Sequence, residues 1–317
     1  MRIERAVAVL LIVAGVPPLA STASTTSAPK IVASFHFSSA PQAIVAGDGG
    51  VWLTTLHALA RIDPRTNKVT QRLQLKPVLG AVTIAGRQLW LARNPIDTGK
   101  TTPAPSQLWS LDTVSGQLHG PPIRFQLIAS LAAAAGAIWV TNGDHAQYGR
   151  LFQIDPRRRR IVTALKIPGA PSGVVGARGL LWIVASDTGY LFRVDPQTAK
   201  LVGEPVRAGK ALLTVAADKD RIWVGDGYAG AVNSVDAGSG RVVTRTRLPD
   251  VSEVAVGDGA VWATVDNPSE LVRLDPKTGA PVGQPLPVPG TASGIAIAFG
   301  SIWVMTGDGV VRVQPSE

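Results

Sequence analysis

The stretch VAVGDGAVWATV (254–265) places an acidic residue between two glycines and follows it with a β-branched run. A phosphate-binding loop would need a helix directly behind it, because the helix N-terminus supplies free N–H groups. Val, Trp and Thr instead favour a strand. Asp-Gly between two strand-like runs is typical of a type I′ hairpin, in which both central residues have positive φ. We therefore predict a β-hairpin turn at Asp258-Gly259.

The same phrase recurs along the chain. VAGDGGVWLTT (45–55), VGARGLLWIVAS (175–186) and IAFGSIWVMT (297–306) are clear copies. The anchor tryptophans of all the copies are Trp52, Trp90, Trp139, Trp182, Trp223, Trp262 and Trp303. They recur at intervals of roughly forty residues, which is the signature of a repeat architecture.

A second phrase follows the tryptophans, and its clearest form is LARIDPRTNKVTQRL (59–73). LFRVDPQTAKLVGEPV (191–206) and LVRLDPKTGAPVGQPL (271–286) match it well, whereas LWSLDTVSGQLHGPPI (108–123) and VNSVDAGSGRVVTRT (232–246) are looser copies. Asp before Pro opens a turn, and its carboxylate accepts hydrogen bonds from N–H groups just downstream. Each repeat thus holds four short strands, which at this period is a propeller blade.

The last repeat ends at GVVRVQPSE (309–317) and lacks a fourth strand, whereas KIVASFHF (30–37) resembles the outer strand of the other repeats. The N-terminal strand is therefore expected to complete the last blade, which removes two open sheet edges. The fold class predicted is all-β: a seven-bladed β-propeller of four-stranded antiparallel blades that spans 30–317.

The N-terminal segment 1–23 has a basic start, an apolar run and small residues before Ala23, as in a signal peptide. We expect cleavage after Ala23, a flexible leader at 24–29 and a secreted or extracytoplasmic protein; an uncleaved signal anchor is the alternative. The sequence contains no Cys, so no disulfide framework supports the fold.

The pattern of VGDGAVW followed by RLDPKTG resembles the streptogramin (virginiamycin) B lyase-like propellers, and more loosely the NHL and YVTN secreted propellers. That resemblance implies the fold across 30–317 and a site at the channel mouth, where the lyases use histidine, glutamate and magnesium. The four histidines here are His36, His57, His119 and His145, so none lies in the later blades. We therefore do not transfer the lyase activity, and we predict no catalytic residue.

The loops after the Trp strands and after the outer strands should open on one face, which we call the top face. All three tyrosines of the chain fall in these loops, and they are Tyr148, Tyr190 and Tyr228. A tyrosine offers a flat apolar face and a hydroxyl, which suits a sugar or peptide ligand. Further ligand-binding candidates in the same loops are Arg93, Asn142 and His145.

Aspartates also recur in the top loops. Asp187, Asp226 and Asp266 come from three adjacent repeats and would suit Ca²⁺ or Mg²⁺ if they converge. Turn chemistry alone is the alternative explanation, because Asp is common in turns. No cofactor is required by any motif in the chain.

The opposite, bottom face is expected to be basic. Arg157, Arg158, Arg159 and Arg160 replace the usual turn of the third repeat, and the formal net charge is +9. These arginines are candidates for contact with an anionic cell-surface polymer, the alternative being a solvated basic turn. No motif for nucleic-acid recognition is present.

The sequence thus favours a monomeric binding or scaffold module with a small glycan, peptide or envelope component as partner. The alternative is a metal-assisted lyase or lactonase-type enzyme that uses the same mouth. A third possibility is a protein whose partner is the envelope alone, through the arginine turn.

Overall fold

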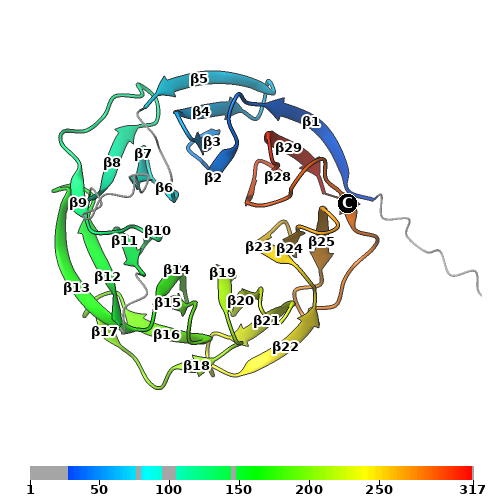
Figure 1. The fold of residues 1–317 in the computed structure, drawn as a ribbon. Helices are drawn as coiled ribbons and strands as arrows, with labels where there is room; N and C mark the ends of the chain where they lie inside the picture. Colours follow the sequence, from blue (N-terminus) through cyan, green and yellow to red (C-terminus); the bar gives the residue numbers. More distant parts are fainter. Residues whose placement is uncertain (1–27, 76–79, 95–104, 144–147, 316–317) are drawn as a thin grey trace, which may run out of the picture.

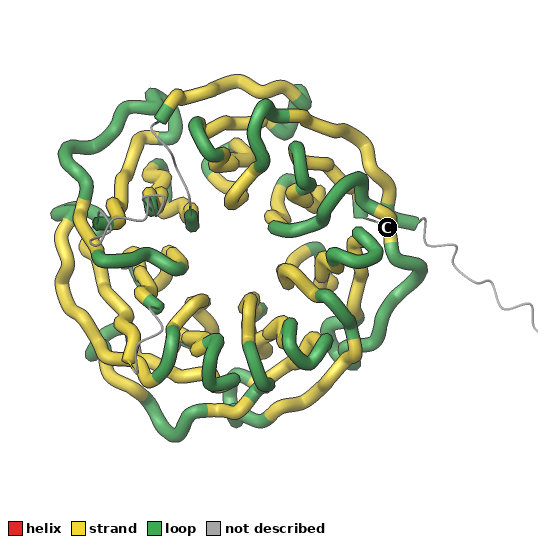
Figure 2. The backbone as a smooth tube through the Cα atoms, in the orientation of Figure 1, coloured by secondary structure: helices red, strands yellow, loops and turns green. Residues whose placement is uncertain are grey.

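The computed structural model describes residues 28–75, 80–94, 105–143 and 148–315. Their strands form seven antiparallel sheets arranged in a ring, and no helix occurs among these residues (Figures 1 and 2). Each sheet is a meander that runs from an innermost strand to an outermost one. The predicted seven-bladed β-propeller is confirmed.

The strands of the first four blades follow the chain order. Blade 1 contains β2 (Pro41–Gly47), β3 (Gly50–Thr55), β4 (Ala58–Asp63) and β5 (Lys68–Gln74). Blade 2 contains β6 (Val82–Ala85), β7 (Gln88–Arg93), β8 (Ser106–Asp112) and β9 (Ile123–Phe125). Blade 3 contains β10 (Ser130–Ala134), β11 (Ala137–Asn142), β12 (Tyr148–Asp155) and β13 (Arg160–Pro168). Blade 4 contains β14 (Pro171–Ala177), β15 (Leu180–Ala185) and β16 (Tyr190–Asp195), with an interrupted outer strand formed by β17 (Lys200–Leu201) and β18 (Val206–Arg207).

The last three blades close the ring. Blade 5 contains β19 (Leu212–Ala217), β20 (Arg221–Asp226), β21 (Ala231–Asp236) and β22 (Val242–Arg247). Blade 6 contains β23 (Val251–Gly257), β24 (Ala260–Val265), β25 (Glu270–Leu274) and β26 (Leu286–Pro287). Blade 7 contains β27 (Ile295–Ala298), β28 (Ser301–Met305), β29 (Gly309–Gln314) and, from the other end of the chain, β1 (Lys30–His36).

The Asp-Gly phrase is a hairpin turn, as predicted. Asp258 and Gly259 have φ values of 50° and 71°, and Asp48 and Gly49 have 46° and 70°. Both central residues therefore lie in the left-handed region that a type I′ turn requires. The strands on either side pair directly, with Gly257 opposite Ala260. No helix follows these glycines, so the stretch forms a turn and not a phosphate-binding loop.

The aspartate of the second phrase holds the turn between the third and fourth strands. Asp275 accepts hydrogen bonds from the N–H groups of Lys277 and Thr278 through Oδ1, at 2.9 and 2.7 Å. The Thr278 N–H is the main cause that lowers the pKa of this carboxyl below its usual value of 3.8. Asp63 and Asp155 accept in the same way from the N–H groups of Arg65 and Arg157. The turn explanation of these aspartates is confirmed.

The arginine of the second phrase packs on the repeat's own tryptophan. Arg61 lies 5.7 Å from the ring centre of Trp52, and Arg312 lies 5.1 Å from that of Trp303. The looser copies lack this arginine, and Ser110 stands opposite Trp90 in blade 2. The residue opposite the tryptophan therefore differs between repeats, whereas the pairing of the two strands is the same.

The seven tryptophans are fully buried and form the core between blades. Trp52, Trp90, Trp139, Trp182, Trp223, Trp262 and Trp303 all have 0% of their surface exposed. Each packs against the next blade: Trp262, for example, shares a cluster with Ile302 and Val311 of blade 7. Because both faces of a blade are covered, its inner strands read as nearly continuous apolar runs.

Ring closure occurs as predicted. β1 pairs with β29 from Lys30 opposite Gln314 to His36 opposite Gly309. Phe35 packs against Trp303 with ring centres 5.9 Å apart, and His36 Nδ1 lies 3.1 Å from Asp308 Oδ2. The first and the last described strands thus share one sheet.

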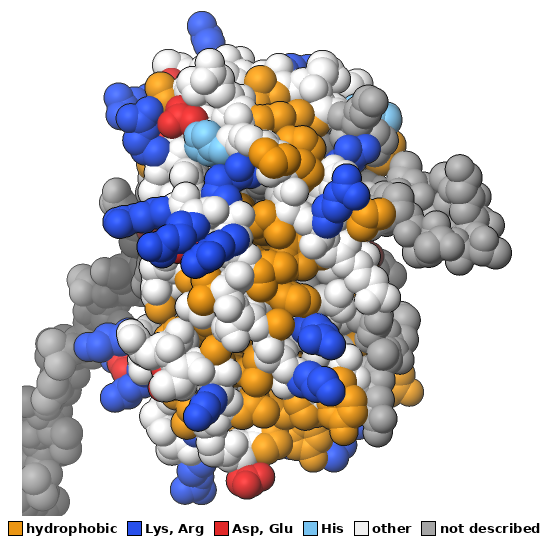
Figure 3. Space-filling model, turned by 90° about the vertical axis from the view of Figure 1, so that its left-hand side faces the viewer, with side chains coloured by type: hydrophobic (Ala, Val, Ile, Leu, Met, Phe, Trp, Pro, Cys, Tyr) orange, Lys and Arg blue, Asp and Glu red, His pale blue; other side chains and the backbone are white. Residues whose placement is uncertain are grey.

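The connections define two faces. Those after the Trp strands and after the outer strands open on the top face, and the hairpins and the Asp turns open on the bottom face. From the side that carries β9 and β13, Lys and Arg side chains are spread over the surface and acidic side chains are few (Figure 3). Within the described ranges, no helix is long and apolar enough to cross a membrane. The predicted signal peptide, 1–23, lies outside them.

Candidate functional site

The innermost strands begin at the top face, and their first residues surround a cavity of about 490 Å³. We call it the mouth cavity. Blades 1 to 6 all contribute to its wall, with Gln42, Ser130, Ser172, Leu213 and Glu253 among the lining residues. The volume lies in the range of pockets that bind small molecules.

Glu253 brings a carboxyl into this cavity. It lies near the start of β23, is half-buried, and its Oε1 accepts a hydrogen bond from the Val254 N–H at 3.2 Å. Burial raises the pKa of Glu253 from 4.5 to about 7, because desolvation disfavours the charged form. The carboxyl can therefore donate or accept a hydrogen bond near neutral pH.

The other groups at the mouth are neutral. The Oγ of Ser172 is buried and has no hydrogen-bond partner within the described residues. Leu213 exposes 54% of its surface and also lines the cavity. An unpaired hydroxyl, an apolar side chain and a protonatable carboxyl are the elements that orient a small amphipathic ligand.

Sequence reasoning missed Glu253, although a signal was present. The pairing register places Glu253 opposite Thr264, Ala43 opposite Thr54 and Thr214 opposite Gly225, so these three inner-strand residues are equivalent. The other two are uncharged. The carboxyl of Glu253 therefore departs from the repeat at this position, where the other two strands have a small neutral residue, and it lines the mouth cavity.

The three predicted metal ligands have separate roles. Asp226 is fully buried, and its oxygens accept from the N–H groups of Lys210, Ala211 and Ala229 at 2.8, 3.1 and 3.1 Å. It therefore holds the loop that leads into blade 5. Asp187 accepts from the Ala170 N–H at 2.7 Å.

Asp266 is exposed on the top face, and its backbone N–H donates to the Asp250 carbonyl at 3.0 Å. Among the described residues, no group of three His, Asp or Glu side chains stands close enough to hold a metal ion. The geometry therefore gives the predicted Ca²⁺ or Mg²⁺ site no support.

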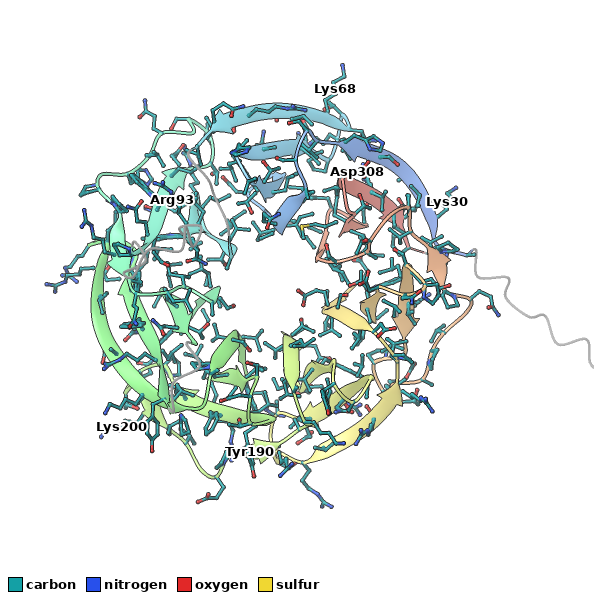
Figure 4. All side chains as sticks on the ribbon, in the orientation of Figure 1. Lys30, Lys68, Arg93, Tyr190, Lys200 and Asp308 are labelled. Atoms are coloured by element: carbon teal, nitrogen blue, oxygen red, sulfur yellow. The ribbon has the colours of Figure 1, made fainter. Side chains whose placement is uncertain are left out.

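Tyr148 and Tyr190 begin β12 and β16, and Tyr228 lies in the turn after β20. None of the three lines the mouth cavity. Tyr190 points to the outer part of the ring (Figure 4), where Arg207 lies 5.8 Å from its ring centre. Tyr228 is 81% exposed and has the Lys210 ammonium 5.9 Å from its ring centre. Tyr148 is exposed in blade 3. Two of the three tyrosine rings thus have a cation over one face.

Two of the remaining ligand-binding candidates, Arg93 and Asn142, do not line the mouth cavity. Arg93 donates to Gln107 Oε1 at 3.2 Å within blade 2 (Figure 4). Asn142 is buried at the end of β11, opposite Arg150. His145 lies outside the described residues.

In the arginine turn (157–160), two of the four arginine side chains contact neighbouring groups of the protein. Arg158 forms an ion pair with Asp155 at 3.0 Å. Arg159 reaches into blade 2, where it donates to Ser110 Oγ at 3.1 Å and to the Pro121 carbonyl at 2.9 Å. Arg157 and Arg160 are exposed. The turn thus links two blades, in addition to presenting positive charge.

Comparison with known proteins supports the fold. No family model and no curated protein matches the sequence. A streptogramin B lyase structure aligns with a TM-score of 0.71 at 15% identity, covering 90% of this chain and 97% of the lyase. The chain shares the lyase fold. BamB from Moraxella catarrhalis aligns with a TM-score of 0.60 at 14% identity, covering 92% of this chain and 98% of BamB. The Neurospora crassa Pan2 WD40 domain aligns with a TM-score of 0.73 at 11% identity, covering 92% of this chain and 97% of that domain. The predicted resemblance to the lyase-like propellers is confirmed as one of fold.

Proposed function

We propose that this propeller is an extracytoplasmic binding or scaffold module that holds a small glycan or peptide ligand in the mouth cavity. The single observation that carries the proposal is Glu253, a carboxyl with a raised pKa in a cavity of about 490 Å³. The propeller fold is compatible with this function, because one such fold hosts many different binding and catalytic sites.

The cavity chemistry indicates the kind of ligand. Leu213 offers an apolar contact, and Ser172 offers a hydroxyl without a partner among the described residues. Near neutral pH, Glu253 exists in both protonation states, so it suits a ligand with hydroxyl or amine groups. A neutral or cationic amphipathic ligand fits better than an anionic one, because ionised Glu253 would repel an anion.

An enzyme is the second candidate, and the same residue favours it. A carboxyl with a pKa near 7 is suited to general acid–base catalysis at neutral pH. Elimination from a bound lactone or ester would need that group within hydrogen-bond reach of the proton it removes. Turnover of such substrates that disappears in Glu253→Gln would support this candidate over simple binding.

A thermal-shift screen tests the proposal. The mature chain is mixed with short peptides, neutral oligosaccharides and amino-sugar oligosaccharides at pH 6 and pH 8. We expect at least one member to raise the Tm of the wild type and to do so less in Glu253→Gln. Glu270→Gln is the matched control, since Glu270 lies on the same blade and starts β25. If no member stabilises the wild type, or if Glu253→Gln responds like the wild type, the mouth cavity is not the ligand site.

A further inference from the structure

A second cavity lies between blades 4 and 5, away from the mouth. It has a volume of about 340 Å³, and its walls come from the end of β18, the loop after it, β21 and β22. We call it the 4–5 groove. Its lining residues include Arg207, Lys210, Asn233, Val242 and Arg245. The cavity is at the small end of the range for ligand pockets, which suits a ligand of about one sugar ring.

Three of these residues are cationic, and the ion pairs of the described residues include none of them. Arg207 lies over the ring of Tyr190 and Lys210 over that of Tyr228. A ring face attracts a cation but carries no net charge, so both side chains keep their positive charge. Arg245 is exposed.

The carboxylate next to the groove does not neutralise these charges from within it. Asp226 lies under the loop, where both of its oxygens accept backbone hydrogen bonds, from Lys210 through Oδ2 and from Ala211 and Ala229 through Oδ1. It is fully buried and is absent from the lining of the groove. One buried negative charge beside three positive ones leaves the groove attractive to anions.

The uncharged wall residues add selectivity. The Nδ2 of Asn233 donates to the Ala208 carbonyl at 2.7 Å, which fixes the orientation of the amide. Its Oδ1 is buried without a hydrogen-bond partner among the described residues, so it lacks a donor such as a ligand hydroxyl. Val242 exposes 46% of its surface and supplies an apolar contact.

We propose that the 4–5 groove binds a small hydroxylated organic anion with the size and chemistry of an acidic monosaccharide. Lys210, Arg207 and Arg245 bind the anionic group, Asn233 accepts from a hydroxyl, and Val242 packs against the apolar face of the ring. This site is independent of the mouth cavity and of the arginine turn.

Isothermal titration calorimetry with D-glucuronate at low ionic strength tests the assignment. We expect binding by the mature wild type that weakens with added NaCl, and no binding of neutral D-glucose. Lys210→Gln/Arg245→Gln should weaken binding of glucuronate about tenfold or more. Arg157→Gln/Arg160→Gln is the matched control, because it removes two exposed arginines from the rival basic surface.

Each contrary outcome overturns a stated part of the proposal. Absence of glucuronate binding, or equal affinity in Lys210→Gln/Arg245→Gln, refutes the groove as an anion site. Weaker binding only in the arginine-turn variant places the anion on the bottom face instead. Inorganic sulfate that binds as tightly as glucuronate refutes the role of the hydroxyl and of the sugar ring. A folded double variant, checked by its Tm, is required for the comparison.

Discussion

Replacing Glu253 with glutamine removes the carboxyl from the mouth cavity and keeps its shape. In the wild type, burial raises the pKa of Glu253 from 4.5 to about 7, so the folded protein binds this proton more tightly than the unfolded chain does. The stabilising contribution is therefore fully present below pH 4.5 and is lost as the pH rises through 7. A shift of this size corresponds to about 3 kcal/mol. Because the half-buried side chain lies in an open cavity, we expect solvent to reduce it to about 1–2 kcal/mol.

Urea denaturation at pH 4.5 and pH 8.5 measures this effect. Between these pH values, the free energy of unfolding of the wild type should fall by about 1–2 kcal/mol relative to that of Glu253→Gln. Glu204→Gln, which changes an exposed carboxyl of blade 4, controls for the other titrating groups. If wild type and Glu253→Gln differ by the same amount at both pH values, Glu253 does not carry a raised pKa, and the reasoning about the mouth cavity fails.

Three further predictions concern stability. Deleting 30–37 should lower the Tm and promote aggregation measured by light scattering, because β29 loses its partner; an unchanged Tm would disprove closure by this strand. Trp262→Ala should cost about 3–5 kcal/mol in urea denaturation, and iodide should quench the wild-type tryptophan fluorescence only weakly; strong quenching would contradict burial of the tryptophans. Asp226→Asn should lower the free energy of unfolding by about 1.5–3 kcal/mol, because the backbone hydrogen bonds to this side chain become weaker. The exposed control Asp266→Asn should change it by no more than about 0.5 kcal/mol. Equal losses in the two variants would contradict the role of Asp226 in holding its loop.

The fold could be predicted because its signals are local and repeated. The Asp258-Gly259 turn needs positive φ at two residues, and few dipeptides other than Asp-Gly and Asn-Gly provide it at low cost. The tryptophan period then fixes the blade, and the unmatched strand at 30–37 fixes the closure. Each of these inferences requires only the residues adjacent in the sequence, or the position of a residue within the repeat.

The site could not be predicted in the same way, because it depends on which loop residues meet in space. Asp187 lies in a top loop as expected, whereas Asp226 is the last residue of β20. Both accept backbone hydrogen bonds, a role that the sequence does not distinguish from metal binding. Tyr228 is exposed as a ligand-binding residue should be, yet the Lys210 ammonium lies over one face of its ring. Arg207 and Lys210, the cations beside Tyr190 and Tyr228, were not identified from the sequence. Each lies on a different segment of the chain from the ring that it contacts.

The most direct test of the central claim is a crystal structure of the protein soaked with the strongest binder from the thermal-shift screen. The account predicts ligand density in the mouth cavity, in contact with Glu253, Ser172 and Leu213. Ligand density confined to the bottom face or to the outer strands, with the mouth cavity empty, would contradict it.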